Sequence, residues 1–302
     1  MNSFIRKGFK RPKILFGITC ILFLYGAGLL APFIAPYDYA TQDILAAREG
    51  PSMAHLLGTD WLGRDILSRI IFSLRTNLII SFATVSTGSL ILGVALGITS
   101  GYFAGKIDGL IMRIGEVFMA FPSLLLVILI AATVRPRVLD WVRGIEDAWN
   151  VTGVVRSGLV DYLVIFGALA AFSWVGMARL VRGQVLFLKE MPYIVAIRST
   201  GASELRIMFR HLLPNAMPPI VVMATMGMGT VVGAEVVLSW LGIGVQPPVP
   251  SLGSMIRDGQ DISVLRNHPQ IILAPVTIVA ILIFSWNLLG DGVNDLLNPR
   301  AW

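Results

Sequence analysis

The side chains that could carry out chemistry are few in this sequence, and their spacing does not group them into a catalytic or metal-binding site. His55, His211 and His268 stand far apart, and the predicted topology puts two of them outside a membrane and one inside, so they cannot share a metal ion. The Gly105-Lys106 pair continues with Ile and Asp, whereas a phosphate-binding loop has Ser or Thr after Gly-Lys. We therefore expect no catalytic residue, no metal and no cofactor, and the chain is not predicted to be an enzyme.

One acidic residue, Glu235, lies within an apolar stretch. An ionisable group in such a place usually faces the interior of a helix bundle or a water-filled cavity. One interpretation puts Glu235, together with Ser239 and Trp240, on a transport pathway or at its outer gate. The other interpretation is a structural acid that is paired with a neighbouring polar group. The sequence leaves both open.

Residues 189–215 form a polar island between two apolar stretches, and we predict that they fold as two short helices. Pro192 suits the first turn of a helix, Gly201 can take the left-handed conformation that ends one, and Ser203 can cap the next. The island cannot lie in hydrocarbon, because it carries seven ionisable side chains: Lys189, Glu190, Arg198, Glu204, Arg206, Arg210 and His211.

The second of these helices is predicted to be amphipathic and to stop at Pro214, which cannot continue a helix as an ordinary interior residue. Arg206 and Arg210 are four residues apart and share one face. At α-helical spacing a different face carries the apolar side chains, Leu205, Met208, Phe209 and Leu212. We interpret the island as a surface that binds another protein, with apolar side chains as the anchor and charged side chains at the rim.

Composition predicts that the rest of the chain lies in a lipid bilayer. Of its 302 residues, 55% are hydrophobic and 14% are charged, compared with about 25% charged in soluble domains. A membrane span needs about 20 apolar residues. Six stretches qualify, and the fold class predicted is therefore an all-α integral membrane protein with six transmembrane helices: 14–31, 78–102, 117–134, 162–178, 216–241 and 271–289.

The distribution of lysine predicts the orientation. Lys7, Lys10 and Lys13 crowd the start with Arg6 and Arg11, which places the N-terminus in the cytoplasm, and six spans return the C-terminus to that side. The net charge of +6 then reflects topology and contact with anionic lipid, not nucleic acid. The predicted organisation is a cytoplasmic N-terminus with the first span (1–35), an external segment (36–77), and a five-helix core (78–302) with an external insertion (135–161).

Small residues recur every four positions in the second span, at Gly93, Gly97, Gly101 and Gly105. Such a row lets helix backbones approach closely in lipid. It could mark a subunit interface, but we favour packing within its own bundle.

Three further expectations concern the connections. Residues 106–116 should make a short inner connection, and Pro122 should bend the start of the third span. Within the 135–161 insertion, apolar and charged side chains recur at the spacing of an amphipathic helix. A short amphipathic helix should also follow Ser251, because the prolines at 247, 248 and 250 prevent a helix before it.

Residues 58–69 read G-T-D-W-L-G-R-D-I-L-S-R. Asp60 could cap a helix that runs from Trp61, and Arg64 and Arg69 could pair with Asp60, with Asp65 or with lipid headgroups. We expect an interfacial helix here that sets the entry angle of the second span.

Four stretches, in this order along the chain, resemble the dipeptide, oligopeptide and nickel-type ABC importer permeases. The first is 58–69, and the second is the island, where Ala196, Gly201 and the Leu-Leu-Pro ending at Pro214 stand at positions of the coupling-loop pattern. Val195 and Ile197 depart from that pattern. The others are V-Q-P-P-V-P-S-L-G at 245–253 and the ending at 287–300. Only the insertion lies outside the resemblance.

The resemblance implies a type I importer fold whose coupling helices lie in the cytoplasm. It implies a heterodimer with a paralogous permease subunit, two cytoplasmic ATPase subunits that hydrolyse ATP, and an external solute-binding protein, in the cytoplasmic (inner) membrane. The residues expected to couple to the ATPases are Ala196, Gly201, Ala202, Ser203, Leu205, Arg206, Met208, Phe209, Arg210 and Pro214. Peptides, nickel chelates, glutathione-like thiols and oligosaccharides all remain open as substrates.

The alternative is a secondary transporter or channel subunit that works without ATPases. Such a protein is expected to show internal repeats and intramembrane residues that couple to ions. Glu235 is the single candidate for such a residue, and the sequence shows no repeat.

Overall fold

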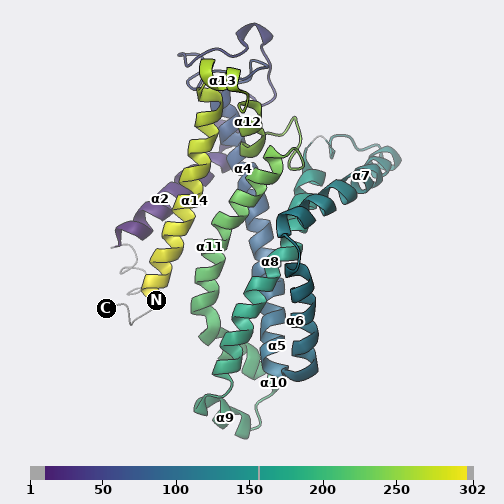
Figure 1. Cartoon of the computed structure of the whole chain (residues 1–302), viewed down its shortest axis with the longest axis vertical. Helices are drawn as coiled ribbons and strands as arrows, with labels where there is room; N and C mark the ends of the chain where they lie inside the picture. Colours follow the sequence, from purple (N-terminus) through teal and green to yellow (C-terminus); the bar gives the residue numbers. More distant parts are fainter. Residues whose placement is uncertain (1–10, 156, 298–302) are drawn as a thin grey trace.

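The computed structural model describes residues 11–155 and 157–297, and its named elements within these residues are all helices (Figure 1). The basic residues Arg6, Lys7 and Lys10 and the ending at 298–300 lie outside the described residues. The elements are α2 (Pro12–Leu29), α3 (Ala31–Ile34), η1 (Ile44–Ala46), α4 (Ile66–Thr84), η2 (Val85–Gly93), α5 (Val94–Phe103), α6 (Gly105–Met119), α7 (Ser123–Trp149), α8 (Leu159–Leu188), α9 (Pro192–Ser199), α10 (Glu204–Arg206), η3 (Ile207–Leu212), α11 (Leu213–Trp240), α12 (Leu252–Asp258), α13 (Ile262–Asn267) and α14 (Gln270–Leu297).

Within the described residues, five helical units are long and apolar enough to cross a membrane, and a sixth span results if the bent pair α6–α7 counts as one. Two of the units join several elements, since α4, η2 and α5 form one and α10, η3 and α11 another. The fourth predicted span, 162–178, is part of a longer helix of 30 residues, α8. The all-α membrane architecture predicted from the sequence is therefore present.

The third span differs from the prediction. Residues 106–116 are not a connection but lie in α6, which follows a tight turn where Ala104 and Gly105 have φ values of 53° and 55°. The axes of α6 and α7 make an angle of 84°. Pro122 immediately precedes α7, in agreement with the predicted bend, because proline has no N–H to extend the hydrogen bonds of the preceding helix.

The insertion at 135–161 is helical in its first half. Helix α7 continues through it to Trp149, with Pro136 inside the helix. Part of the expected apolar face is present, since Val138, Leu139 and Val142 pack against the buried Val160 of α8 and its neighbours, whereas Trp149 at the end of the helix is 78% exposed. This half of the insertion is thus tied to the fourth span.

The helices pack in two groups joined by α11. Figure 1 shows α2 and α14 lying together on one side of α11, and α5, α6 and α8 on the other. One apolar core lies among α2, α4, α11 and α14, and a second joins α4, α8 and α11. A third core, near the end that carries α9, joins α5, α8, η3 and α11.

The glycine row of the second span packs within its own chain, as we favoured. A Cβ on Gly97 would lie 2.6 Å from the carbonyl oxygen of Ala178 in α8, and Gly93 and Gly101 meet α8 in the same way. Gly105 was wrongly included, since it starts α6 with a positive φ and has open space around its Cβ position. The glycines let two backbones approach closely, which is how helices pack tightly in lipid.

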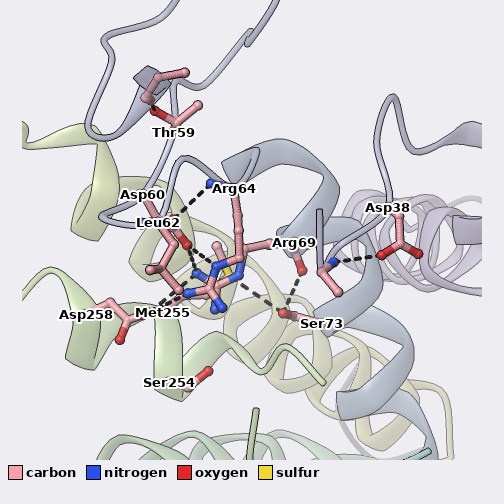
Figure 2. A network of polar contacts seen from close by, with 12 residues as sticks. Asp38, Thr59, Asp60, Leu62, Arg64, Arg69, Ser73, Ser254, Met255 and Asp258 are labelled. Atoms are coloured by element: carbon pink, nitrogen blue, oxygen red, sulfur yellow. Dashed lines mark hydrogen bonds and ion pairs between the residues drawn. The ribbon is translucent and has the colours of Figure 1, made fainter. Parts of the chain in front are cut away.

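Buried charges, rather than an interfacial helix, organise the segment that precedes α4 (Figure 2). Asp60 accepts hydrogen bonds from the backbone N–H groups of Leu62 (2.8 Å) and Arg64 (3.0 Å). Its carboxylate also pairs with the guanidinium groups of Arg64 (2.7 Å) and Arg69. Both arginines reach Asp258 of α12 as well, at 3.7 and 3.4 Å. Asp60, Arg64 and Arg69 are buried, and Asp258 beside them is partly buried. Buried charges in proteins generally need such partners.

The helix expected from Trp61 is therefore wrong. Helix α4 begins at Ile66, and its cap is Asp65, which accepts a hydrogen bond of 2.7 Å from the N–H of Ser68. Asp60 instead holds a tight turn that precedes the helix. By contrast, the helix expected after Ser251 is confirmed as α12, where Ser251 forms a capping box.

Candidate functional site

The polar island lies at the opposite end of the molecule from α12 and α13 (Figure 1). Helix α9 begins at Pro192, as predicted. Gly201 follows it with φ +79°, and no atom lies within 4 Å of its Cβ position, so the left-handed conformation predicted for this glycine is confirmed. Ser203 occupies the N-cap position of α10, although its side chain makes no capping hydrogen bond.

The second helix of the island does not stop at Pro214. Residues 204–240 are one continuous helical unit of 37 residues, so the island runs directly into the fifth span. The wider π-helical turn η3 precedes Pro214, which occupies the first turn of α11. Pro214 has no N–H to donate within this turn. The side chain of the next residue, Asn215, donates a hydrogen bond of 2.6 Å to the carbonyl of His211.

This π-helical turn also divides the apolar side chains that we placed on one face. Met208 and Leu212 are only 3% and 0% exposed and belong to the core formed by α5, α8 and α11, as does Ile207. Leu205 and Phe209 are 67% and 56% exposed. The expected single face is thus wrong, because a π turn contains more residues than an α turn and shifts the spacing of side chains around the axis.

Leu205 and Phe209 instead share the outside of the helix with Arg206 and Arg210, which are exposed. We call these four residues the outward face. Among the described residues, neither arginine of this face makes an ion pair or a hydrogen bond. Of the other island residues, Ala196 is exposed and Ala202 packs on the core beneath.

Polar contacts hold the island against the bundle. The Lys189 ammonium donates a hydrogen bond of 3.2 Å to the carbonyl of Gly101 at the end of α5. Close by in the sequence, Arg182 of α8 donates to Asp108 of α6 at 2.6 Å. The guanidinium of Arg198 lies 5.9 Å from the ring of Tyr102. These contacts fix the positions of α5, α6, α8 and α9 relative to one another.

Glu235 is fully buried, and both of its carboxylate oxygens accept hydrogen bonds. The donors are the side-chain amide of Asn77 in α4, at 3.0 Å, and the hydroxyl of Ser239, at 2.8 Å. Asn77 in turn accepts a hydrogen bond of 3.0 Å from the hydroxyl of Tyr25 in α2. Trp240 is partly exposed and lies outside this network. The structure thus brings together Glu235 and Ser239, but not Trp240.

Comparison with known proteins decides the family. Residues 93–302 match the family described as binding-protein-dependent transport system inner membrane component. The chain belongs to this family. Residues 3–51 match the N-terminal transmembrane domain of oligopeptide transport permease C, and so the resemblance found in the sequence is confirmed.

Relatives of this permease match over most of its length. It is 38% identical to the glutathione transport system permease protein GsiD of Pectobacterium atrosepticum, over 93% of the chain and 84% of the relative. It is 35% identical to the oligopeptide transport system permease protein OppC of Bacillus subtilis (94% and 84%), and 34% to the dipeptide transport system permease protein DppC of Alkalihalophilus pseudofirmus (98% and 90%). These relatives are named as permease proteins, which confirms the expectation of a transport subunit and not an enzyme.

Two residues of the Glu235 network in the permease were not expected from the sequence: Asn77, which donates to Glu235, and Tyr25, which donates to Asn77. An asparagine next to an apolar span is a usable signal, because an amide in a bundle needs a partner there.

The residues of the described ranges contain no group of three or more His, Cys, Asp or Glu side chains that could hold a metal ion.

Proposed function

We propose that this permease is one of the two membrane subunits of an ATP-binding-cassette importer and that the outward face docks on a cytoplasmic ATPase. The complex consists of this chain, a paralogous permease subunit, two ATPase subunits and an external solute-binding protein. Both termini lie in the cytoplasm in this arrangement, on the side of the island.

The observation that carries the proposal is the outward face itself. Leu205 and Phe209 expose large apolar side chains beside Arg206 and Arg210, at the end of a helix whose other side is packed into the bundle. Apolar side chains at the centre of a contact with charged groups at its rim are typical of protein interfaces. The lysine distribution supports a cytoplasmic position for this end, where it would meet an ATPase.

Continuity of the helix supports a mechanism of coupling. Glu235 lies 30 positions after Leu205 in the same unbroken helical unit, which is roughly 45 Å at 1.5 Å per residue. A displacement of the outward face when the ATPases close can therefore move the helix that holds Glu235 to α4. Alternating access by such rigid-body motion of packed helices is one of the known classes of conformational switch.

The names of the relatives favour a peptide or a peptide-like small solute as substrate. The three relatives are named for the transport of glutathione, oligopeptides and dipeptides. These solutes share at least one amide bond and charged ends. We propose a solute of this class, delivered by the external binding protein.

Copurification tests the proposal. The tagged permease, extracted from its host in mild detergent, should bring down an ATPase subunit, whereas the double variant Leu205→Asp with Phe209→Asp should bring down at least about tenfold less. The matched control places the same two changes on exposed apolar side chains at the other end of the molecule, Leu45→Asp with Met53→Asp, and should retain the ATPase. Uptake driven by an ion gradient, with no ATPase recovered from the unaltered chain, would favour the secondary transporter instead.

A further inference from the structure

A polar pocket opens between α4 and α8 at the external end of the bundle, opposite the island. It holds about 170 Å³ and is lined by Tyr39, Phe72, Arg75, Thr76, Ser157 and Tyr162, among others. These residues come from three separate parts of the chain: the external segment, α4, and the stretch that leads into α8 with its first turn. The pocket is too small for a whole peptide, since sites that enclose a drug-sized ligand have about 300 Å³ or more. It can take one end of a solute.

Arg75 supplies the charge of the pocket. It lies in α4, ten residues into a unit that crosses the membrane, and its backbone N–H is close to Gly28, near the external end of α2. The side chain is exposed, and no ion pair or hydrogen bond joins it to any described residue. An unpaired guanidinium at this depth faces water or a ligand, because it cannot face hydrocarbon.

The acidic side chains next in sequence to lining residues, and Glu235, bind groups other than Arg75. Asp38, next to Tyr39, accepts a hydrogen bond of 2.8 Å from the backbone N–H of Ala40. Asp161, next to Tyr162, pairs with Arg135 at 2.6 Å and accepts a hydrogen bond of 3.0 Å from the N–H of Gln246. Glu235 is occupied by its bonds to Asn77 and Ser239. No acidic side chain within residues 11–155 and 157–297 pairs with Arg75, so its positive charge is available to an anion.

The walls of the pocket carry hydroxyl groups and aromatic rings. The hydroxyls of Thr76 and Tyr162 lie 3.2 Å apart and share a hydrogen bond. The rings of Tyr39 and Phe72 meet edge to face, with centroids 4.8 Å apart. A guanidinium flanked by hydroxyl donors suits a carboxylate, which accepts several hydrogen bonds and pairs with arginine in a planar, two-bonded geometry.

We propose that Arg75 and the hydroxyls beside it bind the carboxylate of the transported solute as it enters the permease from outside. This inference rests on the proposed function, in which the solute is a peptide or resembles one and so carries a terminal carboxylate. A carboxylate could also come from an acidic side chain of a partner protein, and a phosphate could come from a lipid headgroup. Binding to either of those sources would not depend on whether the solute carries a carboxylate. The test uses this difference to separate them from binding of the solute.

The test compares a peptide with its C-terminal amide in the complete transporter, reconstituted in proteoliposomes with its binding protein. Initial uptake of trialanine and of trialanine amide is measured for the unaltered complex and for Arg75→Gln, with the amide concentration raised until the unaltered complex gives a measurable rate. Arg75→Lys retains the charge. Arg137→Gln is the matched control, because it removes an exposed arginine of the external side that lies outside the pocket.

We expect Arg75→Gln to lower trialanine uptake roughly tenfold, the scale of a lost charge-assisted hydrogen bond, and to leave uptake of the amide within twofold. Arg75→Lys should retain part of the preference for the acid, and Arg137→Gln should retain all of it. If Arg75→Gln lowers uptake of both peptides equally, its partner is a protein or a lipid and the proposal is overturned. Undiminished uptake of trialanine overturns it too. Failure of the unaltered complex to take up either peptide, while its ATPases copurify, would instead refute the peptide class on which the proposal rests.

Discussion

The side-chain amide of Asn77 donates a hydrogen bond of 3.0 Å to the carboxylate of Glu235, and this bond joins α4 to α11 inside the bundle. The hydroxyl of Ser239 donates to the other carboxylate oxygen. Glu235 thus connects the helical unit that bears the outward face to α4, the helix that carries Arg69 and follows Asp60 and Arg64. Its surroundings match the interpretation of a paired structural acid.

Substitutions of Glu235 separate this interpretation from a role on the pathway. In Glu235→Gln the new amide can accept from Asn77 and donate to Ser239, so we expect thermal stability close to that of the unaltered complex. Glu235→Leu leaves the buried Asn77 amide without an acceptor, which costs about 1 to 3 kcal/mol, and should lower the melting temperature. Loss of uptake in Glu235→Gln, with the complex folded and assembled, would show that the acid acts on the pathway or gate.

Gly201 provides a test of the island. Its φ of +79° costs a residue with a Cβ about 1 to 2 kcal/mol, and a β-branched side chain costs more. Because no atom lies near its Cβ position, Gly201→Val acts through backbone strain alone. We expect ATP hydrolysis stimulated by the binding protein, and uptake, to fall at least severalfold, while the permease still inserts and pairs with its paralogous subunit.

The control for Gly201 is Gly50→Val, at a glycine that also has open space but no positive φ. It should leave stimulated hydrolysis unchanged. Uptake at the unaltered rate in Gly201→Val, at matched expression, would mean that the island does not couple the ATPases to the spans.

Gly97 tests the close packing of α5 on α8. In Gly97→Ala the added methyl would meet the Ala178 carbonyl at 2.6 Å, and such overpacking costs about 1 to 3 kcal/mol. Gly109→Ala adds the same methyl where nothing lies within 4 Å, and it should be neutral or slightly stabilising because alanine favours helix. Equal melting temperatures for the two variants would contradict the packing.

Orientation can be tested by labelling. In a Cys20→Ala background, a cysteine at the exposed Ser203 should react with an impermeant thiol reagent only from the cytoplasmic side. A cysteine at Met53, whose side chain is 96% exposed, should react only from outside. If both cysteines reacted from the same side, the island and residues 36–77 would not lie on opposite sides of the membrane, and the proposed orientation would be wrong.

The sequence by itself determined which stretches of this permease are long and apolar enough to span a membrane, and where the backbone turns at Pro192 and Gly201. Apolar runs indicate spans because a bilayer excludes charge, and this signal does not depend on how the helices pack against one another. The positive φ of Gly201 and the start of α9 at Pro192 were likewise predictable, because both depend on local backbone geometry. The packing of Gly93, Gly97 and Gly101 followed from their spacing, although the choice of α8 as partner did not.

Only the tertiary structure decided which side chains face outward and which charges meet. The π-helical turn ahead of Pro214 separates Leu205 and Phe209 from Met208 and Leu212, and α-helical periodicity cannot anticipate such a change of pitch. The pairing of Arg69 with Asp258 joins residues 189 positions apart, and the bond between Asn77 and Glu235 joins residues 158 apart. Contacts of this kind arise from the way helices assemble around a shared core. The residues next to either partner in the sequence do not predict where the other partner will lie.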